Sequence, residues 1–140
     1  MTGEEIVSAA RALIGTPFVH QGRTRRGLDC VGLLLCVASG FGVACSDVAG
    51  YPRRPGGGLL EQTFDDHVSG GQLVRINPAD KQAGDFLMMR FLGQPQHLAI
   101  YTGKNIIHSY EAVGKVCEHV INGSWASRIV RVYRLAGVES

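Results

Sequence analysis

The hydrophobic pattern at the start of the chain is that of a helix with one apolar face. Thr2 and Glu5 have the spacing of a capping box, in which each side chain accepts a hydrogen bond from the backbone of the other residue. Gly15 is suited to follow the end of a helix. The pattern predicts an amphipathic first helix up to Gly15. Its apolar positions recur at helical spacing, at Ile6, Ala9, Ala10 and Leu13.

A second segment, residues 30–38, is apolar on every side, as in a helix that is buried all round. Asp29 stands immediately before it, and its carboxylate can accept hydrogen bonds from the free amides of the first turn. Residues 16–28, which contain Pro17, Gly22 and Gly27, are predicted to form the loop between the two helices. Cys30 is therefore expected in the first turn of a buried helix.

Beyond Gly71 the pattern changes to short apolar or alternating runs separated by Gly, Pro and Asn. Before it, the Pro- and Gly-rich residues 46–58 are predicted to be irregular, and residues 59–68 to form a short helix. Helices followed by an antiparallel sheet indicate an α+β fold, and the length fits one domain over residues 1–140. The runs predicted to be strands are 73–76, 86–91, 97–101, 106–110 and 129–133.

Composition and charge exclude several classes of function. With 45% hydrophobic and 19% charged residues, the chain can bury a core, and a net charge of +2 gives no nucleic-acid footprint. The basic cluster of residues 23–26 is predicted to be a solvated loop, with contact to an anionic substrate as the alternative. No run approaches the roughly 20 apolar residues of a membrane span, and the acidic Glu4 and Glu5 are unlike a secretory signal. We therefore expect a protein that is made in the cytoplasm and has no membrane anchor. If it acts on the cell wall, lysis, a pore or a phage tail must deliver it there.

Cys30 has the sequence setting of a nucleophile. A thiol at a helix N-terminus experiences the positive end of the helix dipole and free amide donors, which favour the thiolate and lower the thiol pKa. The alternative is an ordinary buried cysteine, the commoner fate of a free thiol. We assign the other three cysteines, Cys36, Cys45 and Cys117, to this class, because none follows a comparable cap. A cytoplasmic origin favours reduced thiols for all four.

A nucleophilic cysteine needs a base, and two of the five histidines are well placed to provide one. His97 and His108 lie in neighbouring predicted strands joined by a tight connection at residues 102–105. Folding this hairpin about its centre brings the two positions close to opposite each other, where cross-strand side chains are about 5 Å apart. A single strand histidine is more often structural, but two in register favour a site. The weaker candidates are His20 in a loop, His67 near a helix end and His119 on a charged edge.

Five short motifs follow one another over most of the chain. They are Gly15-Thr16-Pro17-Phe18, Asp29-Cys30-Val31-Gly32, Gly84-Asp85-Phe86-Leu87, His97-Leu98-Ala99-Ile100-Tyr101 and Ile107-His108. Each motif alone is common, but in order and approximate spacing the set resembles the NlpC family of cell-wall peptidases. Two further segments are similar to a phage-tail branch of that family: Tyr51-Pro52-Arg53-Arg54-Pro55, and a closing Trp-Arg strand from Trp125 to Leu135.

The resemblance implies a papain-like fold, with N-terminal helices packed on an antiparallel sheet or half-barrel, and a hydrolytic reaction. The resemblance further implies that Cys30 attacks a peptide carbonyl, that His97 transfers the proton and that His108 orients His97. The implied substrate is the stem peptide of peptidoglycan, typically at a D-glutamyl to diamino-acid linkage, and no cofactor or metal is implied. The Cys30 amide can help to bind the oxyanion. Around the substrate or oxyanion we expect Phe18, His20 and Asp29.

Two positions depart from the pattern of the family. Many relatives have a tyrosine in place of Phe18, and its hydroxyl is thought to assist near the nucleophile or the substrate. Loss of one oxyanion donor costs on the order of a hundredfold in rate, so the sequence predicts a slow enzyme unless a neighbour such as His20 compensates. Val31 stands where many relatives have serine, and this change is expected to alter only the packing under the site.

Three other functions stay open at the level of sequence. The first is a phage tail assembly or cell-wall binding module with weak or no turnover, against which the joint presence of Cys30, His97 and His108 argues. The second is acyl transfer of the lecithin retinol acyltransferase type, which is expected near membranes. The third is zinc binding, which the wide spacing of Cys30 and Cys36 disfavours.

Overall fold

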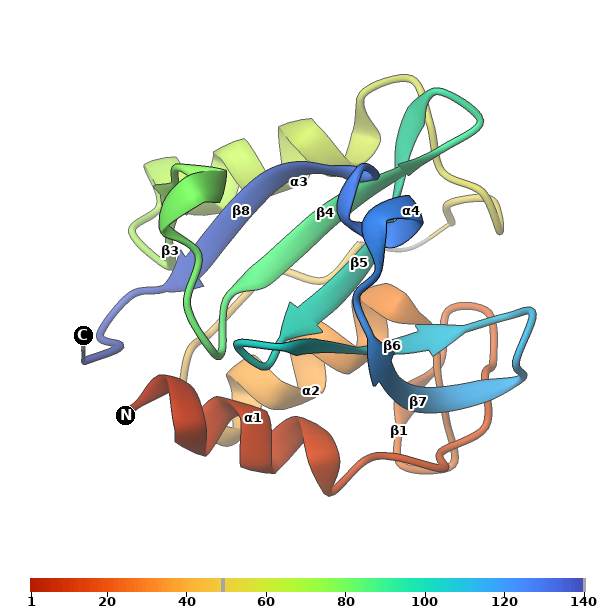
Figure 1. Ribbon diagram of the computed structural model, residues 1–140, viewed down its shortest axis with the longest axis horizontal. Coiled ribbons are helices and arrows are strands. Elements are labelled where there is room, and N and C mark those ends of the chain that lie inside the picture. Colours follow the sequence, from red (N-terminus) through yellow and green to blue (C-terminus); the bar gives the residue numbers. More distant parts are fainter. Residues whose placement is uncertain (49, 140) are drawn as a thin grey trace.

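The computed structural model describes residues 1–48 and 50–139, and helices come before the sheet along most of the chain (Figure 1). The helices are α1 (Gly3–Arg11), α2 (Cys30–Gly40), α3 (Leu59–Ser69), the 3-10 helix η1 (Pro78–Asp80) and the short α4 (Gly123–Ala126). The strands are β1 (Arg23–Thr24), β2 (Gly27–Leu28), β3 (Leu73–Ile76), β4 (Phe86–Phe91), β5 (Gln94–Tyr101), β6 (Asn105–Tyr110), β7 (Lys115–Val120) and β8 (Ile129–Leu135). The α+β class predicted from the sequence is confirmed.

The main sheet is antiparallel throughout, with the strand order β3-β8-β4-β5-β6-β7. All five predicted strands are present, and their ends differ from the prediction by up to three residues. Strand β7 was not predicted, because Lys115, Glu118 and His119 interrupt its apolar pattern and only Val116 is fully buried. Trp125 was expected in the closing strand but lies in α4, where the side chain of Asn122 caps the helix.

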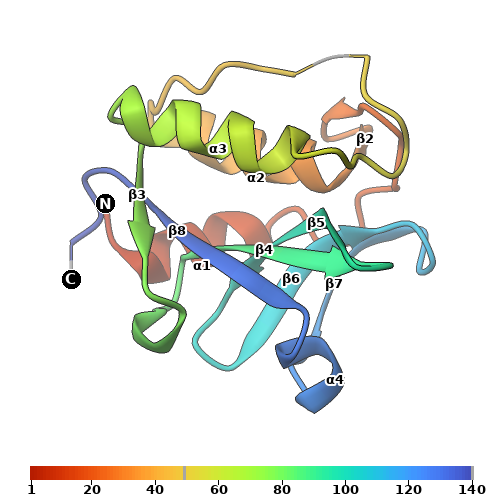
Figure 2. The same cartoon turned by 90° about the horizontal axis from the view of Figure 1, so that it is seen from above.

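The three long helices cover one face of the sheet and α4 lies on the other (Figure 2). The larger core joins α1, α2 and α3 to that face, with Phe64 of α3 packed against Tyr133 of β8 at a ring distance of 4.8 Å. The completely buried Ile6 and Leu33 anchor α1 and α2 in this core, and truncating either to alanine should cost about 2–5 kcal/mol. The smaller core on the opposite face contains Leu87, Met89, Ala99, Ile106 and Val132.

The ends of the first helix follow local chemistry. The predicted capping box is confirmed, because the Glu5 amide donates to the Thr2 hydroxyl at 3.1 Å and the Thr2 amide donates to the Glu5 carboxylate at 3.2 Å. Regular helix ends at Arg11 and gives way to turns before Gly15, whose φ of 93° is suited to glycine. The helix is therefore shorter than the sequence predicted, although it buries the expected face.

Gly84 and Asp85 have a structural task at the start of β4. Gly84 has a φ of 93°, and a Cβ at this position would lie 2.7 Å from the Gly3 Cα, so only glycine fits beside α1. The buried Asp85 carboxylate accepts two hydrogen bonds from the Arg134 guanidinium, at 2.7 and 2.9 Å. This motif therefore fixes β4 against α1 and β8.

Candidate active site

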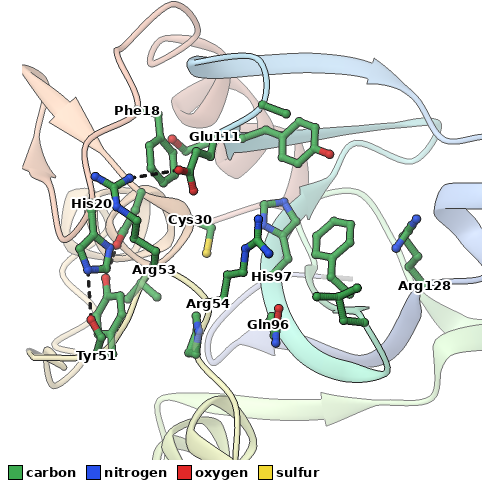
Figure 3. A pocket seen from close by; sticks show the side chains of 18 residues that line it. Phe18, His20, Cys30, Tyr51, Arg53, Arg54, Gln96, His97, Glu111 and Arg128 are labelled. Atoms are coloured by element: carbon green, nitrogen blue, oxygen red, sulfur yellow. Dashed lines mark hydrogen bonds and ion pairs between the residues drawn. The ribbon is translucent and has the colours of Figure 1, made fainter.

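A cleft of about 490 Å³ opens where the N-terminus of α2 meets β5 and β6 (Figure 3). The loop before α2 and the segment 51–55 form one side, and the ends of β4, β5 and β6 form the other. Among its lining residues are five predicted site residues: Phe18, His20, Asp29, Cys30 and His97. His108 does not line the cleft and lies behind His97.

Cys30 is the first residue of α2, as the sequence predicted, and Figure 3 shows its sulfur pointing into the cleft. The Asp29 carboxylate caps the helix by accepting from the Gly32 amide at 2.8 Å. Three backbone amides, of Leu98, Val31 and Cys30 itself, act on the sulfur and favour its negative form. Because Leu98 follows His97 in β5, this interaction brings the nucleophile candidate against the strand that carries its candidate base.

The expected lowering of the Cys30 pKa is wrong for the protein without substrate. Burial raises the pKa of the thiol to about 12, and the negative charge of Asp29 acts in the same direction. The amides at the helix start oppose this shift but do not outweigh it. Although the residue is partly exposed to the cleft, its sulfur is surrounded by protein, so Cys30 is a neutral thiol at neutral pH.

Asp29 is a structural hub as well as a helix cap. Its buried carboxylate accepts hydrogen bonds from the Gln21 amide at 2.9 Å, from the Arg23 guanidinium at 2.9 Å and from the Tyr51 hydroxyl. Arg23 thus leaves the solvated cluster in which the sequence placed it and turns inward, where it also bonds to the Tyr51 hydroxyl at 2.8 Å. These contacts tie the loop before α2 to the segment 51–55, so the Asp29 carboxylate supports the cleft that this residue lines.

Ser109 links the segment before Cys30 to the sheet. Its buried hydroxyl donates to the Leu28 carbonyl at 2.6 Å, two residues before Cys30. Gly32, one turn into α2, lies so close to the Gly22 carbonyl that a Cβ would approach its oxygen to 2.0 Å. The start of α2 is therefore fixed on two sides, by β6 and by the preceding loop.

The structure brings His97 and His108 together, in a register that differs from the predicted one. Ile100 pairs with Ile107 and Tyr101 with Ile106, so the pairing is displaced by two residues from one that sets 97 opposite 108. A displacement of two keeps both side chains on one face, and diagonal neighbours still reach each other. His97 Nε2 lies 2.6 Å from His108 Nδ1.

A third histidine, which the sequence placed only among the weaker candidates, extends this pair. His108 Nε2 lies 2.8 Å from Nε2 of His119 on β7, and His119 Nδ1 lies 3.1 Å from the Val120 carbonyl. Burial lowers the pKa of both His97 and His108, and the charge of neighbouring histidines acts in the same direction. The two inner imidazoles are therefore neutral at neutral pH. The available signal was the equal spacing of 11 residues between the three histidines.

The opposite side of the cleft carries His20, Tyr51 and Phe18. His20 Nε2 donates to the Tyr51 carbonyl at 3.1 Å, and the two rings meet edge-on at 5.5 Å. Burial raises the pKa of the Tyr51 phenol, as does its hydrogen bond to Asp29. The Tyr51 hydroxyl is thus held by Asp29, and Phe18 has no hydroxyl to offer in the cleft.

Charged side chains stand at the mouth of the cleft. Arg53 and Glu111 form an exposed ion pair at 3.1 Å that joins the two sides (Figure 3). Arg54 has no ionic partner among the described residues, and Arg128 packs its guanidinium on the Phe91 ring at 4.6 Å. With Asp29 and Glu111 both paired, the cleft presents unpaired positive charge to a ligand.

The remaining candidates lie away from this site. His67 accepts from the Ser46 amide at 2.9 Å and donates to the Thr63 carbonyl at 2.7 Å, so it holds α3 to the segment before it. All four cysteines carry free thiols. Within residues 1–48 and 50–139 there is no cluster of side chains suited to a metal ion. In the same residues no helix has the length and apolar character needed to cross a bilayer.

Comparison with proteins of known structure gives similar folds. The NlpC/P60 domain of the peptidoglycan hydrolase SagA is 25% identical and covers 94% of this chain and 97% of its own, with a TM-score of 0.62. An NlpC/P60 family protein from Bacillus cereus is 20% identical over 94% of this chain and 39% of its own, with a TM-score of 0.69. The peptidoglycan hydrolase RipB from Mycobacterium tuberculosis is 20% identical over 99% of this chain and 65% of its own, with a TM-score of 0.66.

These likenesses confirm the papain-like α+β fold expected from the resemblance. Comparison with curated proteins gives no significant match. The model of one protein family, NlpC/P60, matches residues 15–134, a range that begins at Gly15 and ends in β8. With this match over most of its length, the chain belongs to the NlpC/P60 family.

Proposed function

We propose that the protein is a cysteine endopeptidase that hydrolyses peptidoglycan stem peptides, with Cys30 as nucleophile, His97 as base and His108 as the group that orients His97. One observation carries the proposal: Cys30 and His97 line the same cleft, and His108 occupies Nε2 of His97. Nδ1 of His97 is then the nitrogen left to accept the thiol proton. The relatives SagA and RipB, which are described as peptidoglycan hydrolases, support the choice of substrate.

The protonation states define the first step. Because the Cys30 thiol and the His97 imidazole are both neutral at rest, proton transfer accompanies the attack of sulfur on the carbonyl. The S–C bond forms, the thiol proton passes to His97, and the carbonyl oxygen gains the negative charge. The Cys30 amide, at the first position of α2, is free of helical partners and can donate to this oxyanion.

The later steps reuse the same imidazole. Collapse of the tetrahedral intermediate breaks the C–N bond, and the leaving amine takes the proton from His97. Water then attacks the thioester while His97 accepts its proton, and the proton returns to sulfur as the acid product leaves. No external oxidant or cofactor enters this balance, and the cycle ends with the neutral thiol with which it began.

The charge of the cleft supports an acidic peptide as substrate. Stem peptides carry free carboxylates beside a D-glutamyl to diamino-acid linkage, which is the bond the sequence resemblance points to. Arg54 and Arg128 offer guanidinium groups to such carboxylates, a pairing that is frequently bidentate. We expect this linkage to be preferred over neutral peptide bonds.

The test is digestion of purified sacculi and defined stem peptides, with products analysed by mass spectrometry. Wild type should release fragments with a new carboxyl and a new amino group at one linkage, and Cys30→Ala should release none. Cys117→Ala, which removes a thiol outside the cleft, is the matched control and should match wild type. Equal product yields from wild type and Cys30→Ala would remove the cysteine mechanism.

A cell-wall binding or tail assembly module with weak turnover is the second candidate. Two observations favour it: the raised pKa of the Cys30 thiol, and the absence of a hydroxyl on Phe18. Sedimentation of the protein with sacculi separates the two candidates. If the protein is a binding module, wild type and Cys30→Ala should bind sacculi equally well, and neither should release fragments.

We further propose that the protein acts with a phage tail, or is encoded by a prophage, at the bacterial cell wall. The proposal rests on sequence alone, on the segment 51–55 and on the similarity of residues 125–135 to the tail-associated branch. Mass spectrometry of purified virions from an induced host culture should detect the chain. Its absence from virions that carry all their tail proteins would reject the association.

A further inference from the structure

Three imidazoles form a continuous chain that ends on a backbone carbonyl. The contacts are 2.6 Å from His97 Nε2 to His108 Nδ1, 2.8 Å from His108 Nε2 to His119 Nε2, and 3.1 Å from His119 Nδ1 to the oxygen of Val120. Each distance is that of a hydrogen bond. The chain spans β5, β6 and β7 and leads away from the cleft.

The carbonyl at its end fixes the direction of every hydrogen bond. A carbonyl oxygen only accepts, so His119 Nδ1 must carry a hydrogen, and in the neutral ring Nε2 of His119 is then an acceptor. His108 must therefore donate from Nε2 and accept at Nδ1. By the same step, His97 donates from Nε2 and its Nδ1 carries a lone pair.

We propose that His119 is a positioning residue that, through His108, holds His97 in the tautomer whose Nδ1 can accept the Cys30 proton. The catalytic meaning of this chain rests on the proposed function, whereas the tautomer of His97 does not. His108 by itself fits either direction, because each of its nitrogens can donate or accept. His119 with the Val120 carbonyl decides between the two.

Aromatic rings enclose the chain and keep its geometry. Tyr110 stacks on His108 at 5.0 Å with an angle of 12° between the planes, and Trp125 meets His108 edge-on at 5.2 Å. Trp125 also lies against His119 at 5.0 Å. His108 is fully buried and His119 is partly exposed, so His119 is the ring at which the chain meets water.

A proton from solvent can reverse the chain. If His119 gains a proton on Nε2, both of its nitrogens donate, and His108 must then accept at Nε2 and donate from Nδ1. His97 in turn accepts at Nε2 and carries its hydrogen on Nδ1, so it can no longer take the thiol proton. The groups that face His119 are His108 from β6 and the uncharged Trp125 from α4, with the Arg128 guanidinium beyond the indole at 5.8 Å.

Two substitutions separate positioning from packing. His119→Gln keeps an oxygen that can accept from His108 but cannot carry the reversing proton. His119→Phe fills the space and removes the acceptor. Glu118→Gln is the matched control on the same strand, because Glu118 bonds to Arg11 and Asn105 away from the chain.

The first readout is nitrogen NMR of the histidine rings, which distinguishes the two tautomers without any turnover. In wild type at neutral pH, His97 should carry its hydrogen on Nε2, and acidification should move it to Nδ1 while the ring stays neutral. His119→Gln should keep the Nε2–H form on acidification, and His119→Phe should give a mixture. Glu118→Gln should behave as wild type.

The second readout is the pH profile of stem-peptide hydrolysis. The acid limb should move to lower pH in His119→Gln, and kcat should fall about tenfold in His119→Phe, the scale of one neutral hydrogen bond. An unchanged His97 tautomer and acid limb in both variants would overturn the inference. The wild-type protein could also hydrolyse nothing and still hold His97 in the Nε2–H form, with that form lost in His119→Phe. This result would remove the proposed function and support the inference.

Discussion

Acidification should destabilise the protein through its two buried imidazoles. Burial lowers the pKa of His97 and of His108, so the folded state holds both rings neutral at pH values where the unfolded chain has bound protons. The unfolded state then binds more protons than the folded state. Stability must therefore fall as the pH drops through the unfolded value of about 6.5.

The size of the effect follows from the same shifts. Each neutral imidazole costs about 1.4 kcal/mol for every pH unit below the unfolded pKa, which is about 2 kcal/mol at pH 5. Two rings give about 4 kcal/mol between pH 7.5 and pH 5. A domain of ordinary stability has about 5–15 kcal/mol in total, so the loss would be a large fraction of it.

Urea unfolding at pH 7.5 and pH 5 measures this difference directly. The double variant His97→Gln/His108→Gln should lose most of the pH dependence, whatever its stability at pH 7.5. Cys30→Ala keeps both imidazoles and should keep the full difference. If the double variant retains the whole pH dependence of the unfolding free energy, carboxylates or other histidines cause the acid sensitivity, and the assignment to these two rings is wrong.

Three substitutions test other parts of the site. Phe18→Tyr returns a hydroxyl to the cleft and should raise kcat by up to about a hundredfold on stem peptides, and an unchanged kcat would mean that another donor serves. Asp29→Asn removes the negative charge that raises the pKa of Cys30, so iodoacetamide should label Cys30 at lower pH than in wild type, while Arg23 keeps its ion pair with Asp47. Labelling at the wild-type pH would contradict the role of that charge. Ser109→Ala removes one of two hydrogen bonds to the Leu28 carbonyl, the other coming from the Val19 amide at 3.2 Å, and should lower the free energy of unfolding by about 0.5–1.5 kcal/mol. Thermal melting at the wild-type temperature would show that the link is dispensable.

Elements with one dominant local signal were predictable from the sequence. The capping box of α1, the buried helix α2 behind Asp29 and the five alternating strands were all confirmed, because periodicity and caps act over a few residues. Position 30 at a helix start and two histidines on neighbouring strands also follow from such signals. Their catalytic roles stay predictions.

What the sequence missed depends on distant parts of the chain. The Cys30 thiol was expected to be acidic from its helix position, but its pKa depends on how deeply other segments bury the sulfur. His119 was ranked low because the sequence around it is polar and charged. Only the pairing of β7 with β6 brings the His119 ring against His108. Arg23 was placed in a solvated cluster because the partners that draw it inward, Tyr51 and Asp47, lie more than 20 residues away.

The contact between Arg53 and Glu111 affects how a ligand enters the cleft. Both side chains are more than half exposed, and an ion pair of this kind contributes about 0–1 kcal/mol. A bridge that weak breaks and re-forms with thermal motion of the two side chains, so it does not close the mouth of the cleft to a ligand. Under the proposed function, a stem peptide in the middle of a cross-linked wall could then enter the cleft from the side, without a free end to thread.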